Sequence, residues 1–144
     1  WAFMAYEDWA KSVNLEPIFI EQTVWSLTHG YAGTLDLLAK VNGETVLIDF
    51  KTSKSIYAEY DLQSVAYQHA LIEMGHQAPS AGLIVRLPKH EHDPQFEVHR
   101  CGSVDSLLPI FLAVRDVWQW WYAAEQASKA AWIAKQEVRH VFGA

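Results

Sequence analysis

Residues 33–51 read GTLDLLAKVNGETVLIDFK, two runs of strand-forming residues joined by Asn42-Gly43. An Asn-Gly pair is the strongest short-range signal of a β-hairpin, because a type I′ turn needs positive φ at both of its central residues. With this pair as the loop, counting outward along the two strands brings Asp36 opposite Asp49. The stretch therefore predicts a hairpin that carries two carboxylates side by side.

The hairpin also brings an amine to the same face. Directly opposed residues in a sheet have Cβ atoms about 4.5–5.5 Å apart, and side chains two residues apart share a face. Asp36, Asp49 and Lys51 therefore lie together. Two carboxylates at this spacing repel each other unless a cation sits between them, and Mg²⁺ or Mn²⁺ prefers oxygen ligands. We expect a divalent metal site here, with the backbone carbonyl of Phe50 as a further ligand.

The alternative for these residues is that Asp36 and Asp49 are solvated and that Lys51 is their salt-bridge partner. Aspartate is depleted in strands, and Asp49 stands between Ile48 and Phe50, an apolar setting. These two observations favour the metal site.

Glu21 is a candidate for a third or water-bridged ligand. Closing the preceding hairpin around Thr28-His29 pairs Glu21 with Asp36, so that three carboxylates share one row. The alternative is that Glu21 is a surface carboxylate on an edge strand.

Hydrophobic periodicity and turn residues predict the element order αβββαββα in one α/β domain, residues 1–144. The predicted helices are 1–13, 58–74 and 104–136, and the predicted strands are 18–27, 31–41, 44–50, 81–87 and 95–101. Asn14 ends the first helix, Gly75 ends the second and Ser103 caps the third. The domain is thus expected to have a central mixed sheet flanked by helices, followed by a long C-terminal helix.

Alternation along the first three strands predicts which side chains form the core. One face packs against helices through Ile18, Ile20, Val24, Leu35, Leu37, Ala39, Val41, Val46, Ile48 and Phe50. The other face carries the polar residues together with Leu38 and Leu47. In the last helix Phe111, Val114, Trp118 and Trp121 follow helical spacing and are expected in the core. Trp120 falls off this stripe, and is expected at an interface, over the sheet edge or stacked on a base.

Composition excludes several classes of protein. The net charge of −6 argues against a broad nucleic-acid-binding surface, and residues 1–50 alone carry a net of −5. The single cysteine, Cys101, excludes an internal disulfide framework and any four-cysteine metal site within the chain. No apolar run reaches the roughly 18 residues of a membrane span, and no signal peptide is recognised at the start. A cytoplasmic protein without a membrane partner is expected. Because it begins with Trp1, the chain is expected to be a piece or processed form of a longer protein.

Two polar residues on the second predicted helix complete the pattern. Gln63 and Tyr67 are four residues apart and share one helix face, just after the loop that follows Lys51. They are candidates for contacts with a substrate or for holding Lys51 in place. Taken alone, they are equally consistent with ordinary packing.

Together these motifs resemble the PD-(D/E)XK nuclease superfamily, and within it the RecB-like branch that includes phage exonucleases. The resemblance spans about residues 17–88 and rests on Gly33-x-x-Asp36, Asp49-x-Lys51 and Gln63-x-x-x-Tyr67. It implies a restriction-endonuclease-like core and a nuclease that hydrolyses DNA with Mg²⁺ or Mn²⁺, in recombination, repair or phage DNA processing. It further implies that Asp36 and Asp49 bind the metal, Lys51 is catalytic, and Gln63 and Tyr67 bind the substrate.

The chain departs from this branch in two respects. The branch usually has a histidine on an upstream helix, and residues 1–28 contain none. Either Glu21 takes its place or an upstream helical segment is missing. The iron–sulfur cysteines of some members are absent as well.

Partners and alternative functions follow from the same pattern. The expected partners are single- or double-stranded DNA, with a second copy of the chain or a replication or recombination protein as further candidates, in a prokaryotic or phage-infected cell. The alternative function is a non-catalytic nucleic-acid-binding or assembly module that kept the fold. A metal-dependent enzyme acting on a small phosphorylated compound is a third possibility.

Overall fold

The computed structural model describes residues 1–93 and 96–142, with side chains up to residue 136. Its helices and strands follow the predicted order. Their bounds are α1 Ala2–Ser12, β1 Leu15–Ser26, β2 Tyr31–Val41, β3 Glu44–Lys51, α2 Ala58–Glu73, β4 Ala81–Arg86, β5 Glu97–Arg100 and α3 Val104–Phe142. Contacts divide the chain into two compact units, Trp1–Phe111 and Leu112–Ala144. The first unit holds all the strands named above.

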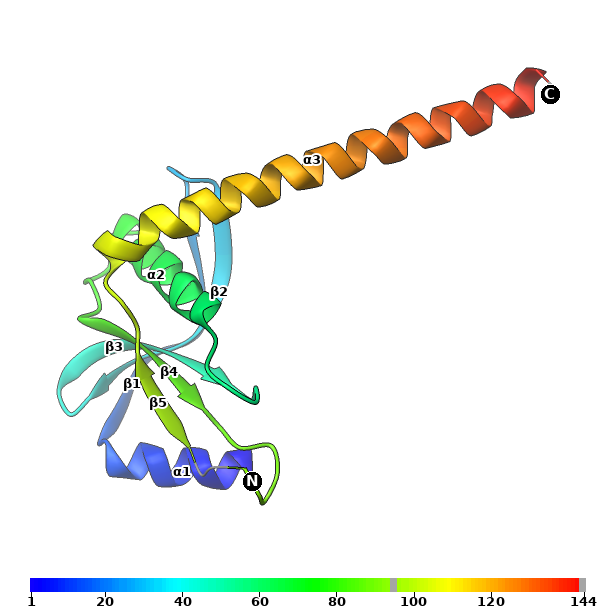
Figure 1. The fold of residues 1–144 in the computed structure, drawn as a ribbon. Helices are drawn as coiled ribbons and strands as arrows, with labels where there is room; N and C mark the ends of the chain where they lie inside the picture. The colour runs from blue at the N-terminus through cyan, green and yellow to red at the C-terminus, as the bar shows by residue number, and fades with distance from the viewer. Residues whose placement is uncertain (94–95, 143–144) are drawn as a thin grey trace. The chain divides into compact units, whose positions relative to one another are not determined.

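The described strands form one five-stranded sheet in the order β1-β2-β3-β4-β5 (Figure 1). Strands β3 and β4 are parallel, whereas the other neighbours are antiparallel. Two parallel strands need a crossover connection, and α2 supplies it. The sheet is therefore mixed, as predicted, with β3 near its middle.

The predicted hairpin between β2 and β3 is confirmed. Asn42 and Gly43 have φ of 50° and 83°, as a type I′ turn requires. The register runs from Val41 opposite Glu44 to Leu37 opposite Ile48.

Helices cover both faces of the sheet, which the predicted division into an apolar and a polar face did not provide for. On one face α1 packs through Ala5 and Trp9 against a cluster that includes Leu37, Ala39, Val46, Ile48 and Val85. On the other face α2 packs through Ala70 and Leu71 against Val24, Leu35, Leu38 and Leu47. Leu38 and Leu47 lie on the face opposite Leu37 and Ile48, as predicted, and α2 buries both.

Strand β1 begins earlier than predicted and is irregular. Its register shifts between Pro17 and Phe19, and Ile18 and Ile20 are 43% and 69% exposed. Their assignment to the core was wrong: Ile20 keeps its predicted partner Leu37, but β1 is the edge strand of the sheet and both side chains stay exposed. Beyond it, the predicted register around the Thr28-His29 loop is confirmed at Phe19 and Ile20 and from Gln22 to Ser26, whereas the predicted pair of Glu21 with Asp36 is not among the paired positions.

Strand β2 changes its alternation at Asp36. Leu35 packs in the cluster beneath α2, whereas Leu37 packs in the cluster beneath α1. Strict alternation predicts one face for both, so the assignment of Val24 and Leu35 to the face of Leu37 and Ile48 was wrong. Asp36, which lies between them, therefore does not follow the regular alternation of a strand.

The predicted helix ends are confirmed, and two lengths differ. Asn14 and Gly75 have φ of 47° and 88°, and Ser103 Oγ accepts a hydrogen bond from Ser106 N at 3.3 Å. Strand β5 is shorter than predicted, and residue 95 lies outside the described residues. Helix α3 continues beyond residue 136 to Phe142, with Pro109 tolerated in its first turns. Within residues 1–93 and 96–142, no helix combines the length and apolarity needed to cross a membrane.

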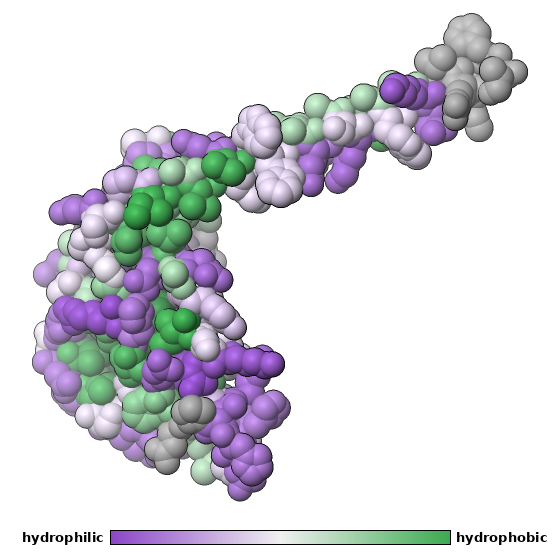
Figure 2. All heavy atoms as spheres, in the orientation of Figure 1, coloured by the Kyte–Doolittle hydropathy of each residue, from purple (hydrophilic) through white to green (hydrophobic). Residues whose placement is uncertain are grey.

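Helix α3 presents many of its apolar side chains to solvent. Figure 2 shows hydrophobic residues gathered over its first turns, where Ile110 is 50% exposed. Further along, Val114, Trp118 and Trp121 are more than half exposed, so their assignment to the core was wrong. Trp120 is the most exposed tryptophan of this helix at 71%.

Candidate active site

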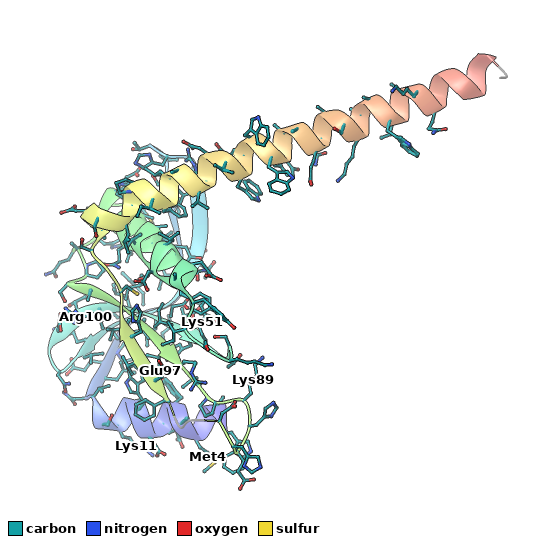
Figure 3. All side chains as sticks on the ribbon, viewed as in Figure 1. Met4, Lys11, Lys51, Lys89, Glu97 and Arg100 are labelled. Atoms are coloured by element: carbon teal, nitrogen blue, oxygen red, sulfur yellow. The ribbon has the colours of Figure 1, made fainter. Side chains whose placement is uncertain are left out.

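Lys51 is the last residue of β3 (Figure 3), and Asp49 lies two residues before it on the same strand. Lys51 Nζ lies 2.7 Å from Asp49 Oδ2. Only 8% of Asp49 is exposed, because β3 has neighbours on both sides and its partner Ile84 on β4 is fully buried. The strand thus carries a carboxylate into the interior and supplies one cation beside it.

Asp36 reaches the same strand through its side chain. It directly precedes Leu37, the outermost residue of β2 that pairs with β3, and its Oδ2 accepts a hydrogen bond from Phe50 N at 2.9 Å. If the β2–β3 pairing continued, Phe50 N would donate to a backbone carbonyl of β2. Here the Asp36 carboxylate accepts that hydrogen bond instead. Asp36 therefore binds the backbone next to Asp49, and its charge acts on that carboxylate, although the regular pairing of β2 with β3 ends at Leu37 and Ile48.

Burial raises the pKa of Asp49, because a charged carboxylate loses hydration in the interior. The Lys51 ammonium opposes this shift, and the charge of Asp36 adds to it. The contact of Asp49 Oδ2 with Lys51 is an ion pair without regular hydrogen-bond geometry, and no other donor in the described part of the chain reaches this buried oxygen. A buried carboxylate oxygen with spare acceptor capacity, next to a second carboxylate, suits a divalent cation.

Contacts from α2 hold the amine of Lys51 in place. Gln63 Oε1 accepts a hydrogen bond from Lys51 Nζ at 2.9 Å, and Gln63 Nε2 donates to the hydroxyl of Tyr67 at 3.1 Å. The ammonium also lies 4.8 Å from the centroid of the Tyr60 ring, a cation–π contact. The sequence interpretation missed Tyr60, although its position three residues before Gln63 puts it on the same helix face.

Gly33 makes room for this arrangement. A Cβ atom at residue 33 would lie 2.5 Å from Cε1 and 2.7 Å from the hydroxyl of Tyr67. Any side chain at this position would displace the ring, and with it the hydrogen bond to Gln63. The glycine that precedes Asp36 by three residues therefore serves the close approach of β2 to α2.

A cavity of about 470 Å³ opens beside Asp36 on the α1 side of the sheet. Glu21 and Asp36 both line it, together with the aromatic rings of Phe3 and Tyr6. Glu21 has a left-handed φ of 50°, so it lies outside the regular pairing of β1. The structure brings Glu21 and Asp36 to one cavity, and the metal-binding roles of Glu21 and of the Phe50 carbonyl stay predictions.

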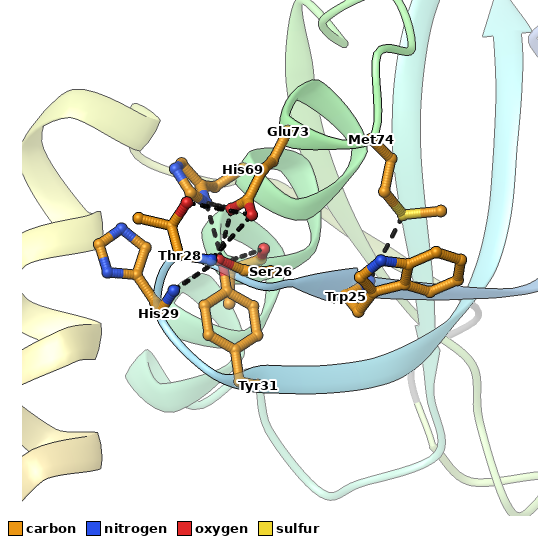
Figure 4. Close-up of polar contacts among 9 residues, drawn as sticks. Trp25, Ser26, Thr28, His29, Tyr31, His69, Glu73 and Met74 are labelled. Atoms are coloured by element: carbon orange, nitrogen blue, oxygen red, sulfur yellow. Dashed lines mark hydrogen bonds and ion pairs between the residues drawn. The ribbon is translucent and has the colours of Figure 1, made fainter.

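Glu73 ties the opposite end of the β1–β2 hairpin to α2 (Figure 4). Its carboxylate accepts hydrogen bonds from the hydroxyl of Ser26 and from the backbone nitrogen and hydroxyl of Thr28. These hydrogen bonds, with that from Ser26 as the largest cause, lower the pKa of Glu73 to about 2. The hairpin that carries Asp36 is thereby anchored on the helix that carries Gln63 and Tyr67.

Comparison with known proteins identifies the family. No protein with a curated description matches the chain. A family model, the PD-(D/E)XK nuclease superfamily, matches residues 3–141. The mixed sheet flanked by helices agrees with the restriction-endonuclease-like fold. With nearly its whole length matched, the chain belongs to the PD-(D/E)XK nuclease superfamily.

Proposed function

We propose that the protein is a metal-dependent nuclease that hydrolyses phosphodiester bonds of DNA. The observation that carries this proposal is the buried Asp49 carboxylate, which lies against Lys51 and beside Asp36. A hydrophobic interior tolerates two carboxylates and one amine at a high cost, and such costs are typical of catalytic sites. Membership of a nuclease superfamily supports the same conclusion.

In this proposal Asp36 and Asp49 hold Mg²⁺ or Mn²⁺, with the Phe50 carbonyl and Glu21 as candidates for further ligands. When bound, the cation supplies Lewis-acid chemistry: it lowers the pKa of a bound water and offsets charge on the phosphate. The carboxylates fit this task because hard cations take oxygen ligands.

Lys51 interacts with the phosphate or with the attacking water. Its ammonium stabilises the negative charge that develops as phosphorus is attacked, provided that it is held in position beforehand. Gln63 and Tyr60 hold it there, and Tyr67 positions Gln63 in turn. We further propose that Gln63 and Tyr67 bind the substrate backbone from the same helix face.

The substrate and setting are the finer part of the proposal. We propose an exonuclease of the RecB-like type, acting on single- or double-stranded DNA in recombination, repair or phage DNA processing. The cavity beside Asp36, with Phe3 and Tyr6 in its wall, has room and aromatic surface for a nucleotide. We place the activity in the cytoplasm of a prokaryotic or phage-infected cell, with a second copy or a replication or recombination protein as candidate partners.

One observation favours the second candidate, a non-catalytic nucleic-acid-binding or assembly module. Lys51 and Asp49 already neutralise each other at 2.7 Å. Because the Lys51 ammonium already balances the charge of Asp49, a bound cation would stabilise this carboxylate less.

Labelled DNA separates the two functions. The protein is incubated with single-stranded, linear double-stranded and circular double-stranded DNA in Mg²⁺, Mn²⁺ or EDTA. The proposal expects cleavage with either metal and none in EDTA, and the exonuclease form expects circular DNA to survive. DNA binding that persists in EDTA, with no cleavage under any condition, would select the non-catalytic module. Cleavage of circular DNA would overturn the exonuclease part alone.

A further inference from the structure

A second group of polar side chains lies where α2 begins and β5 ends. Asp61 stands in the first turn of α2, His99 is in β5, and Cys101 directly follows β5. One carboxylate oxygen, one imidazole nitrogen and the thiol sulfur all lie within 4.8 Å of one another. No other set of three such ligand atoms is found this close among the described residues.

We propose that Asp61, His99 and Cys101 form a zinc-binding site, made of residues that the proposed nuclease site does not use. Thiolate, imidazole and carboxylate are the ligands that Zn²⁺ takes in proteins, at about 2.0–2.3 Å from the metal. Ligand atoms on one tetrahedral zinc ion are therefore roughly 3.3–3.8 Å apart, so a group whose atoms all lie within 4.8 Å of one another needs only small side-chain adjustments to hold the ion. Mg²⁺ does not compete for such a site, because it prefers oxygen ligands.

The backbone around the three residues is held in place. Cys101 N donates a hydrogen bond to Gly82 O at 2.9 Å, and Gly102 N donates to Asp61 Oδ2 at 3.2 Å. The other carboxylate oxygen of Asp61 lies 2.8 Å from His99 Nε2. A zinc ion needs this last pair to separate by about half an ångström, which a side-chain rotation supplies without moving the strand.

The site is open to an entering ion. The side chains of His99 and Asp61 are 42% and 20% exposed, so water reaches them. Three protein ligands and one open position are the arrangement of zinc sites that keep a bound water.

Cobalt titration and equilibrium dialysis of the full chain test the site without any nucleic acid. After treatment with EDTA, the protein is expected to bind one Zn²⁺ per chain, with no competition from excess Mg²⁺. Co²⁺ is expected to produce a thiolate-to-metal absorption band, which is diagnostic because Cys101 is the single cysteine. Cys101→Ser and His99→Gln should each weaken zinc binding at least about 10-fold. His92→Gln is the matched control, since His92 is an exposed histidine outside the group.

Two outcomes would overturn the zinc site. One is a wild-type protein that gives no thiolate–cobalt band, a result that needs no variant to fold. The other is equal zinc affinity in folded Cys101→Ser, which would leave the contact of His99 with Asp61 as a simple tie between β5 and α2. Neither outcome bears on the nuclease proposal, which concerns Asp36, Asp49 and Lys51 and is tested by metal-dependent DNA cleavage.

Discussion

Lys51 is the residue on which the proposed chemistry depends most. Its ammonium meets Asp49, Gln63 and the Tyr60 ring, so it is held before any substrate arrives. Lys51→Ala should lower the DNA cleavage rate about 10²–10³-fold, the usual cost of removing one positioned group that stabilises developing charge. Lys54→Ala, a change at an exposed lysine three residues on, is the control and should cleave normally. Equal activity in the two variants would exclude Lys51 from the mechanism.

The charged carboxylate of Asp49 should lower the stability of the folded protein while being required for DNA cleavage. Its pKa is raised above the ordinary value of 3.8, so the folded state binds its proton more tightly than the unfolded state does. The free energy of unfolding therefore falls as pH rises from 3.8 through the raised pKa, and the charged form is a burden at neutral pH. Asp49→Asn should unfold at a higher temperature than wild type at pH 7 without metal, yet cleave no DNA. A lower midpoint would mean that the ion pair with Lys51 outweighs the cost of burial.

Added Mg²⁺ should offset the destabilising effect of the charged Asp49 in the wild-type protein. At about ten times the dissociation constant, binding adds about 1.4 kcal/mol to the free energy of unfolding, which raises the melting temperature by roughly 3–6 °C. Asp49→Asn should show little of this increase in thermal melts followed by circular dichroism. An equal increase in both proteins would place the cation elsewhere.

Gly33 and Tyr67 form a pair whose coupling can be measured. In Gly33→Ala the new methyl group meets the Tyr67 ring at 2.5 Å, so the ring and the Gln63 contact must shift. The cleavage rate should fall on the order of 10-fold, since small displacements of positioned groups are costly. In a Tyr67→Ala background the same glycine change should have almost no further effect. Additive losses would show that Gly33 acts through something other than the ring.

At the scale of elements, the attachment of the β1–β2 hairpin to α2 should depend on pH. Hydrogen bonds from Ser26 and Thr28 lower the pKa of Glu73 to about 2, from an ordinary value of 4.5. A depressed carboxyl pKa stabilises the folded state above 4.5, and this contribution is lost as pH falls from 4.5 towards 2. Glu73→Gln should therefore lower the melting temperature at pH 7, and the difference from wild type should shrink below pH 4.5. Glu59→Gln, on the same helix but exposed, is the control.

At the scale of the whole molecule, Trp1–Phe111 contains the complete described sheet and all the proposed catalytic residues. A chain that ends after residue 111 should fold on its own and unfold in one cooperative step. It should also keep its metal-dependent cleavage within about a factor of ten, because no proposed ligand lies in Leu112–Ala144. Urea unfolding followed by circular dichroism, with DNA cleavage measured alongside, checks this. A truncated chain that folds but does not cleave would assign part of the active site to the second unit.

The sequence by itself determined the order of elements, the β2–β3 hairpin and the residues beside each other within it. Local chemistry decides these features, since Asn42-Gly43 specifies the turn and the two-residue repeat of a strand then carries the register outward. The shared helix face of Gln63 and Tyr67 could also be predicted from the sequence, because helix periodicity puts residues four apart on one face.

The tertiary structure alone decided what lies on each side of the sheet. Leu38 and Leu47 are buried because α2 crosses over that face, whereas Ile18 and Ile20 lie on the edge strand β1 and are exposed. The change of face at Asp36, the contact of Tyr60 with Lys51 and the approach of Asp61 to Cys101 are likewise set by the tertiary structure. Such contacts depend on how elements pack and where strands stop pairing, and neither is encoded in a local pattern of residues.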